Sequence, residues 1–115
     1  MLVVDDSETS LEATARYLQL SGHTVLKAAD GQSAIDSARS FKPEKVLLDL
    51  SLPDMDGYEV LKQLKALDGL EDTVFIAVTG FGEEEQARAM DAGFNYFLSK
   101  PIDMEGLVKL LARDN

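Results

Sequence analysis

The 115-residue sequence contains no cysteine, only three prolines and a single histidine. The lack of cysteine excludes disulfide scaffolds, thiol catalysis, cysteine-ligated zinc and iron–sulfur clusters. Basic residues are also scarce: 11 lysines and arginines face 21 acids, giving a net charge of −10 and a pI near 4.4. Acids exceed bases equally before and after Gly57, so the net negative charge does not mask a basic segment in either part of the chain. We therefore expect no direct binding to nucleic acid or to an anionic membrane surface.

Long hydrophobic runs are absent as well. No apolar run approaches the ~20 residues of a membrane-spanning helix, and the N-terminus lacks the charged and apolar segments of an export signal. We therefore expect a cytoplasmic location. The length is close to the commonest size of one domain, and roughly two-thirds of the unfolded chain's surface can be buried at this size. We expect one domain over residues 1–115.

Short apolar runs alternate with segments of helical spacing. The runs predict buried strands at residues 2–4, 24–26, 45–48, 74–78 and 96–98. They are continuously apolar, which is typical of parallel strands covered on both faces. Between and after them, apolar residues at helical spacing predict five helices. These stripes are Leu11/Ala15/Leu18, Ala34/Ala38/Phe41, Val60/Leu64/Leu67, Ala87/Met90 and Leu107/Leu110/Leu111.

Local signals agree with this division of the chain. They are helix caps at Ser7 and Asp103, turns at Asp30-Gly31 and Asp68-Gly69, and left-handed residues at Gly22 and Gly93. Five consecutive strand–helix units with right-handed crossovers predict a parallel sheet with helices on both faces. Five units are too few for an eight-stranded barrel, so we expect an open, doubly wound α/β sheet with five helices.

Polar residues gather where the predicted strands end. Asp5-Asp6 follow the first strand, Asp49 the third, Thr79-Gly80 the fourth and Ser99-Lys100-Pro101 the fifth. Open α/β sheets bind ligands beyond the carboxyl ends of their strands, at the switch in strand order. If the first and third strands flank that switch, three carboxylates converge beside a hydroxyl and an ammonium group.

Three clustered carboxylates must hold a cation or have a raised pKa. Oxygen ligands without histidine or cysteine favour Mg²⁺, which commonly bridges a carboxylate and a phosphoryl oxygen. With a lysine and a threonine beside them, these groups suit phosphoryl transfer to an aspartate nucleophile. The loop that follows Asp49 turns into the third helix, and Pro53 and Gly57 supply restricted and permissive backbone positions for that turn.

Over essentially its whole length the sequence resembles the receiver domain of two-component response regulators. The resemblance rests on Asp5-Asp6, on Asp49 with Pro53 and Gly57 downstream, on Thr79, and on Lys100-Pro101. Each element alone is weak, but all of them in order at the correct strand ends are specific. The resemblance implies a flavodoxin-like fold with strand order 2-1-3-4-5.

The same resemblance implies a role for each acidic residue. Asp49 would accept a phosphoryl group from a phosphohistidine of a sensor histidine kinase or phosphotransfer domain. Asp6 would bind Mg²⁺ directly and Asp5 through water, with Asp49 and the backbone carbonyl of Ser51 as further ligands. Asp54 and Asp56 are interpreted as turn acids, with a metal role as the less favoured alternative.

The remaining family positions form the switch. Lys100 and Thr79 would contact the phosphoryl oxygens, Thr79 only after phosphorylation. Phe97 would be the aromatic residue that turns inward behind Thr79, with Tyr96 as the alternative. The resemblance also implies a cis bond between Lys100 and Pro101. Gly80 replaces the alanine that many members carry, which should leave the phosphoryl group at least as accessible.

Two other functions remain as alternatives. One is a phosphohydrolase of the haloacid-dehalogenase type, although Ser51 stands where such enzymes carry a second aspartate; the other is a receiver-like module that binds partners without phosphorylation. Nucleotide or flavin binding is disfavoured, because Asp-Asp-Ser rather than a glycine-rich loop follows the first strand.

The output is left open by the sequence. Nothing follows Asn115, so the chain is expected either to stand alone or to be cut from a hybrid sensor kinase or a transcriptional regulator. The run Thr79-Gly80-Phe81-Gly82 looks like receivers of hybrid kinases. An effector domain or target protein would be controlled through the fourth helix, fifth strand and fifth helix, and the same surface could support a homodimer.

Overall fold

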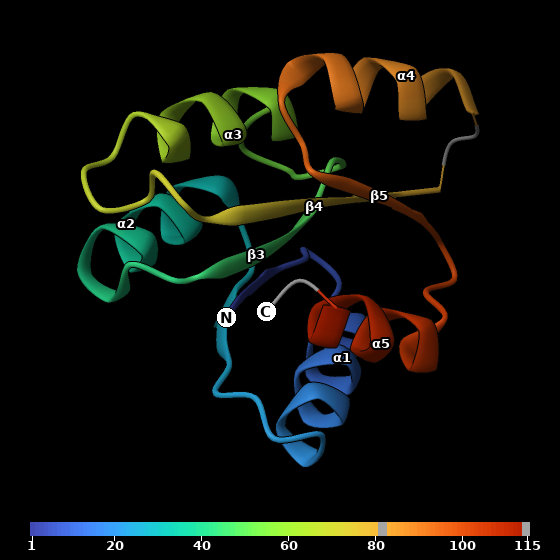
Figure 1. The fold of residues 1–115 in the computed structure, drawn as a ribbon. Helices are drawn as coiled ribbons and strands as arrows, with labels where there is room; N and C mark the ends of the chain where they lie inside the picture. Colours follow the sequence, from blue (N-terminus) through green and yellow to red (C-terminus); the bar gives the residue numbers. More distant parts are fainter. Residues whose placement is uncertain (81–82, 114–115) are drawn as a thin grey trace.

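The computed structural model describes residues 1–80 and 83–113, and its centre is a parallel sheet. The strands are β1 (Leu2–Val4), β2 (Leu26–Ala28), β3 (Lys45–Asp49), β4 (Val74–Thr79) and β5 (Tyr96–Ser99). Their order is β2-β1-β3-β4-β5, with every neighbouring pair parallel (Figure 1). The predicted doubly wound fold and strand order are confirmed.

Five helices cover the two faces of this sheet. They are α1 (Glu8–Leu20), α2 (Gly31–Phe41), α3 (Gly57–Lys65), α4 (Glu83–Ala92) and α5 (Met104–Arg113). α1 and α5 lie on one face, and α2, α3 and α4 on the other (Figure 1). Each face has its own buried hydrophobic cluster, so the sheet is covered on both sides as its apolar strands require.

Most of the local signals are confirmed. The Ser7 side chain accepts a hydrogen bond from the Ser10 amide and caps α1. Asp103 directly precedes α5, and its carboxylate accepts a hydrogen bond from the Gly106 amide in the first turn of that helix. Gly22 and Gly93 have positive φ after α1 and α4. These features fix the ends of the elements.

Two predicted details are wrong. β2 spans Leu26–Ala28 rather than 24–26, because β1 begins at Leu2, whose partner in register is Leu26. Asp30-Gly31 is not a turn: the Asp30 side chain accepts a hydrogen bond from the Ser33 amide and caps α2, which begins at Gly31. The Asp30-Gly31 pair therefore marks the start of α2 and not a turn.

The predicted apolar stripes hold for α1 and α5, and for α3 except Leu67, which lies two residues beyond the end of the helix. They do not hold throughout α2 and α4. Phe41 is 40% exposed at the end of α2. In α4, Ala87 and Met90 are exposed and the buried residue is Ala89. Within the described part of the chain, no helix is both long and apolar enough to cross a membrane.

Candidate functional site

Three carboxylates meet at the carboxyl-terminal edge of the sheet, as the sequence predicted. One oxygen of each of Asp5, Asp6 and Asp49 lies within 4.8 Å of the others. Asp49 is only 2% exposed and Asp5 is 6% exposed, whereas Asp6 is open to solvent. Buried like charges at this spacing favour a bound cation or a retained proton.

Strand register explains why these residues meet. Val4 of β1 pairs with Leu48 of β3, so the residues that follow them, Asp5 and Asp49, emerge side by side. On the other side of β3, Asp49 pairs with Val78 of β4, which places the fully buried Thr79 one residue further along. The chain passes from β2, on one side of β1, to β3 on the other side, so the switch in strand order lies between β1 and β3, where Asp5 and Asp49 emerge.

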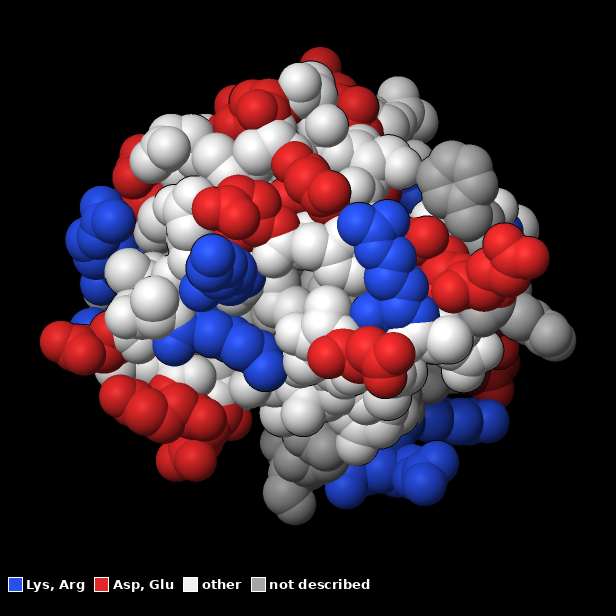
Figure 2. Space-filling model, turned by 90° about the horizontal axis from the view of Figure 1, so that it is seen from above, with Lys and Arg blue, Asp and Glu red and all other residues white. Residues whose placement is uncertain are grey.

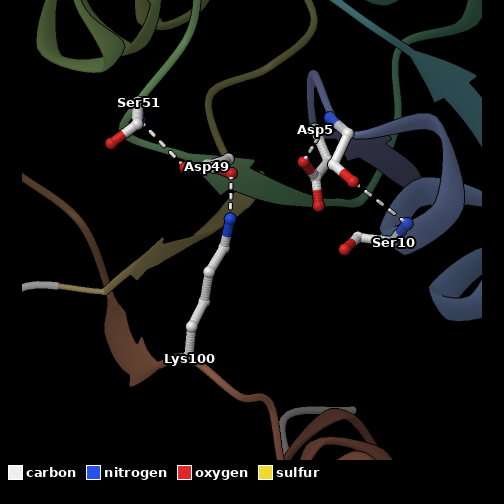
Figure 3. A network of polar contacts seen from close by, with 6 residues as sticks. Asp5, Ser10, Asp49, Ser51 and Lys100 are labelled. Carbon is white, nitrogen blue, oxygen red and sulfur yellow. Dashed lines mark hydrogen bonds and ion pairs between the residues drawn. The ribbon is translucent and has the colours of Figure 1, made fainter.

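Lys100 completes the site from the end of β5. Its amide donates to the Thr79 carbonyl at 2.9 Å, and its Nζ lies 2.5 Å from Oδ2 of Asp49 (Figure 3). Partial burial works against the ammonium charge. The hydrogen bond to Asp49 and the negative charges of Asp49, Asp5 and Asp6 outweigh that effect and raise the pKa of Lys100. The lysine therefore stays cationic beside the acids.

Asp5 is held by the start of α1. Its Oδ1 accepts a hydrogen bond from the Ser7 amide at 2.9 Å. Burial raises the pKa of Asp5, and the neighbouring Asp49 adds to this effect, although the Ser7 amide and Lys100 oppose it. The carboxylate cluster therefore carries an electrostatic cost that a cation would relieve.

The loop between β3 and α3 approaches the site closely. The Ser51 amide donates to Asp49 Oδ1 at 2.9 Å, which orients the carboxylate (Figure 3). Gly57 is not in a left-handed conformation, so its predicted role as a permissive backbone position is wrong. A Cβ there would lie 2.7 Å from Leu50 Cα, so glycine is needed because the loop passes so near. Pro53 lies exposed in the same loop.

Asp54 has a role that sequence reasoning missed. Its two carboxylate oxygens accept the Gly31 and Gln32 amides at 2.8 and 3.0 Å, capping α2 from a loop 22–23 residues away. These backbone hydrogen bonds lower the pKa of Asp54. A Cβ on Gly31 would lie 2.5 Å from Met55 Cγ, so this glycine makes room for the loop. No local pattern could have shown a cap so distant in sequence.

The two candidate switch aromatics lie on opposite faces of the sheet. Phe97 packs against the cluster on the α2–α4 face, whereas Tyr96 packs against the α1–α5 cluster. A Cβ added to Gly80 would meet no described atom within 4 Å. Phe81 and Gly82 of the Thr79–Gly82 run lie outside the described residues. The Lys100–Pro101 bond is cis, as the resemblance implied.

A cavity of about 470 Å³ adjoins the site on the α1 and α5 side. Its lining includes Asp5, Thr14, Lys100, Pro101 and Met104. Of the three clustered acids only Asp5 lines this hollow, which has mixed polar and apolar character and lies beside Lys100.

Sequence comparison decides the family. The response regulator receiver domain family matches residues 1–112. The chain belongs to this family. The polar-differentiation response regulator DivK of Brucella anthropi is 32% identical over 114 residues, covering 96% of this chain and 91% of DivK. Receiver domains therefore account for nearly the whole chain.

Solved receiver structures agree with the fold in detail. Vibrio cholerae chemotaxis protein CheY4 superposes with a TM-score of 0.91 at 29% identity, covering 99% of this chain and 96% of CheY4. The NtrX receiver domain of Brucella abortus gives 0.87 at 28% identity, covering 98% and 95%. The chain is thus a CheY-like receiver.

Family membership places this receiver in two-component signalling as a phosphorylated switch rather than a catalytic enzyme. The phosphohydrolase interpretation is therefore wrong. Receivers work with histidine kinases, and the Asp5, Asp6 and Asp49 cluster is consistent with the phospho-acceptor and magnesium site of the family.

Proposed function

We propose that Asp49 accepts a phosphoryl group from the phosphohistidine of a sensor histidine kinase or phosphotransfer domain. The observation that carries this proposal is the environment of its carboxylate. Asp49 is buried, lies against two further acids, and has the Lys100 ammonium 2.5 Å from one oxygen. An acid in this setting is a poised nucleophile whose charge is balanced by a fixed cation.

The transfer needs no redox partner. One Asp49 oxygen attacks phosphorus, the new O–P bond forms as the P–N bond to the donor imidazole breaks, and the leaving nitrogen keeps the electron pair. Lys100 balances charge on the phosphoryl oxygens, and its raised pKa keeps it protonated throughout.

The donor set fits Mg²⁺. Asp6 would bind it directly and Asp5 through water, with Asp49 and the Ser51 carbonyl completing the protein ligands. Clustered carboxylate oxygens with no nitrogen or sulfur donor suit this hard cation. When bound, Mg²⁺ neutralises charge on the phosphoryl group during transfer. The raised pKa of Asp5 supports the fit, because a cation relieves the cost of that charge.

The switch would run from the phosphoryl group to the α4–β5–α5 surface. Thr79 would bond to the phosphoryl oxygens after transfer, and Gly80 leaves open space beside it. Phe97 is favoured over Tyr96 as the switch aromatic, because it lies on the α4 face of the sheet. Pro53 and Gly57 shape the loop that follows the acceptor, and Pro101 shapes the loop after Lys100.

The partners follow from this switch. An effector domain or target protein would bind the α4–β5–α5 surface, and a homodimer could use the same surface. We propose a cytoplasmic location, where a kinase and its receiver meet, and no direct contact with nucleic acid or membrane, because the net charge is −10.

The test is to incubate the protein with Mg²⁺ and a small acyl-phosphate donor and to measure its intact mass. We expect a gain of one phosphoryl group that disappears in Asp49→Asn and when Mg²⁺ is chelated. Asp91→Asn, an exposed acid of α4 with no described contact, is the matched control and should be phosphorylated normally. A gain that survives Asp49→Asn would overturn the assignment. Phosphorylation absent from the wild type, with no Mg²⁺ binding in a titration, would favour the module that only binds partners.

A further inference from the structure

α4 has little apolar anchorage of its own. Among residues 84–92, Ala89 is the only buried one, and all the others except the half-buried Glu85 are exposed. The next firm apolar anchor is Phe94, two residues beyond the end of the helix. Burial is the main force that fixes a helix on a sheet, so α4 needs another means of attachment.

Tyr58, in the first turn of α3, supplies one such contact. Its ring meets Phe94 edge-on at 6.2 Å between centroids, and its hydroxyl donates to Glu85 Oε1 of α4 at 2.5 Å. Burial, reinforced by the hydrogen bond and charge of Glu85, raises the pKa of Tyr58 to about 12. The phenol therefore remains a donor to a charged acceptor, the stronger class of hydrogen bond.

Arg88 of α4 adds a second contact to the same residue. Its guanidinium lies 4.2 Å from the centroid of the Tyr58 ring, and a nitrogen lies 3.9 Å from Asp56 Oδ2. Asp56 in turn caps α3, because its Oδ1 accepts the Tyr58 amide at 2.9 Å. Acidic and basic side chains are interspersed on the side of the molecule that carries α3 and α4, seen from above in Figure 2.

We propose that these four side chains, Asp56, Tyr58, Glu85 and Arg88, form an α3–α4 latch that holds α4 in the position of the unphosphorylated domain. The latch thereby limits how readily phosphorylation moves α4. This regulatory role rests on the function proposed above, whereas the attachment of α4 does not.

The position of the latch supports this role. Asp56 and Tyr58 directly follow the loop that leaves Asp49, and α4 begins four residues after Thr79. The latch therefore joins two segments that both leave the phosphorylation site. The contacts of the latch are formed in the arrangement in which Lys100 bonds directly to Asp49. Contacts made in only one of two states shift the population toward that state.

The first experiment uses the unphosphorylated protein without Mg²⁺. Tyr58→Phe removes only the hydroxyl and keeps the ring that packs against Phe94 and Arg88. We expect hydrogen exchange of the α4 amides to accelerate about fivefold to tenfold, as for the loss of one charge-assisted hydrogen bond. Glu85→Ala should act alike, and the double variant should add little to either single one.

Glu84→Gln is the matched control for the acidic partner. Glu84 is the exposed neighbour of Glu85 on the same helix and makes no described contact, so exchange of α4 should stay unchanged. Unchanged exchange in Tyr58→Phe, equal effects of Glu84→Gln and Glu85→Ala, or additive effects in the double variant would overturn the latch. Circular dichroism confirms that each variant is folded.

The second experiment measures the rate of phosphorylation by the small acyl-phosphate donor with Mg²⁺. We expect Tyr58→Phe and Glu85→Ala to be phosphorylated about twofold to fivefold faster than the wild type, because less of the population is held in the latched state. Equal or slower phosphorylation would overturn the regulatory role. If the wild type is not phosphorylated at all, the proposed function is refuted. The hydrogen-exchange result on the attachment of α4 is then unaffected.

Discussion

α3 and α4 lie over the same face of the sheet but are attached to it by different means. α3 buries Gly57, Val60, Leu61 and Leu64, whereas α4 buries Ala89 among its described side chains. Apolar burial is strong and non-directional, so a helix fixed by it resists displacement. A helix held by a few polar side chains can be released by breaking one or two contacts. The difference teaches which helix can serve as the moving part.

The division matches the positions of the two helices relative to the acceptor. α3 begins eight residues after Asp49, and its first residue lies against Leu50, so its rigidity supports the geometry of the site. α4 follows Thr79 and belongs to the proposed output surface. A rigid helix beside the chemistry and a loosely attached helix beside the output suit a switch with two populated states.

The largest expected effect tests the difference in burial. Leu64→Ala in α3 should lower the free energy of unfolding by about 3 kcal/mol, because Leu64 is fully buried. Met90→Ala in α4 should change it by no more than about 0.5 kcal/mol, because Met90 is 44% exposed. Urea unfolding followed by circular dichroism measures both. Similar losses in the two variants would show that α4 is anchored as firmly as α3.

A smaller effect separates the two roles of Asp56. Asp56→Ala should lower the free energy of unfolding by about 1 kcal/mol, because it removes the cap of α3. Asp56→Ser keeps a capping oxygen and should lower the free energy of unfolding by only about 0.3 kcal/mol. Both variants lose the partner of Arg88, so hydrogen exchange of α4 should accelerate equally in the two. Faster exchange in Asp56→Ala alone would mean that the cap, not the ion pair, holds α4.

Much of the fold and of the site was predictable because it depends on local pattern and topology. Continuous apolar strands gave the parallel sheet, and strand-end positions brought Asp5, Asp49 and Lys100 together. Parallel strands place their carboxyl ends at one edge of the sheet, so residues that directly follow different strands in the sequence are expected to lie close together in the fold. The resemblance to receivers then added a chemical role to each of these residues.

What could not be predicted depends on contacts between distant segments. Asp54 caps a helix that starts 23 residues earlier, and Tyr58 meets Glu85 across 27 residues. Neither pair leaves a periodic signal in the sequence. The apolar stripe expected in α4 was wrong for a related reason: Ala87 and Met90 have helical spacing, but the helix turns Ala89 toward the core. With so few apolar residues, spacing alone does not fix which side faces the sheet.

The smallest expected effect concerns the ionisation of Tyr58. Its pKa is raised to about 12 from the ordinary 10.0, so the neutral phenol is favoured in the folded protein. The stability that this contributes is complete below pH 10 and is lost as the pH rises toward 12. Tyrosinate absorbance of the wild type minus that of Tyr58→Phe should therefore titrate near 12. Glu85→Gln should lower this pKa only in part, because burial, the largest cause, remains, and Glu84→Gln should leave it unchanged. A difference titration near 10 would mean that α4 does not cover Tyr58 in solution. The contact between Tyr58 and Glu85 would then not hold α4, and the polar attachment that distinguishes α4 from α3 would be refuted.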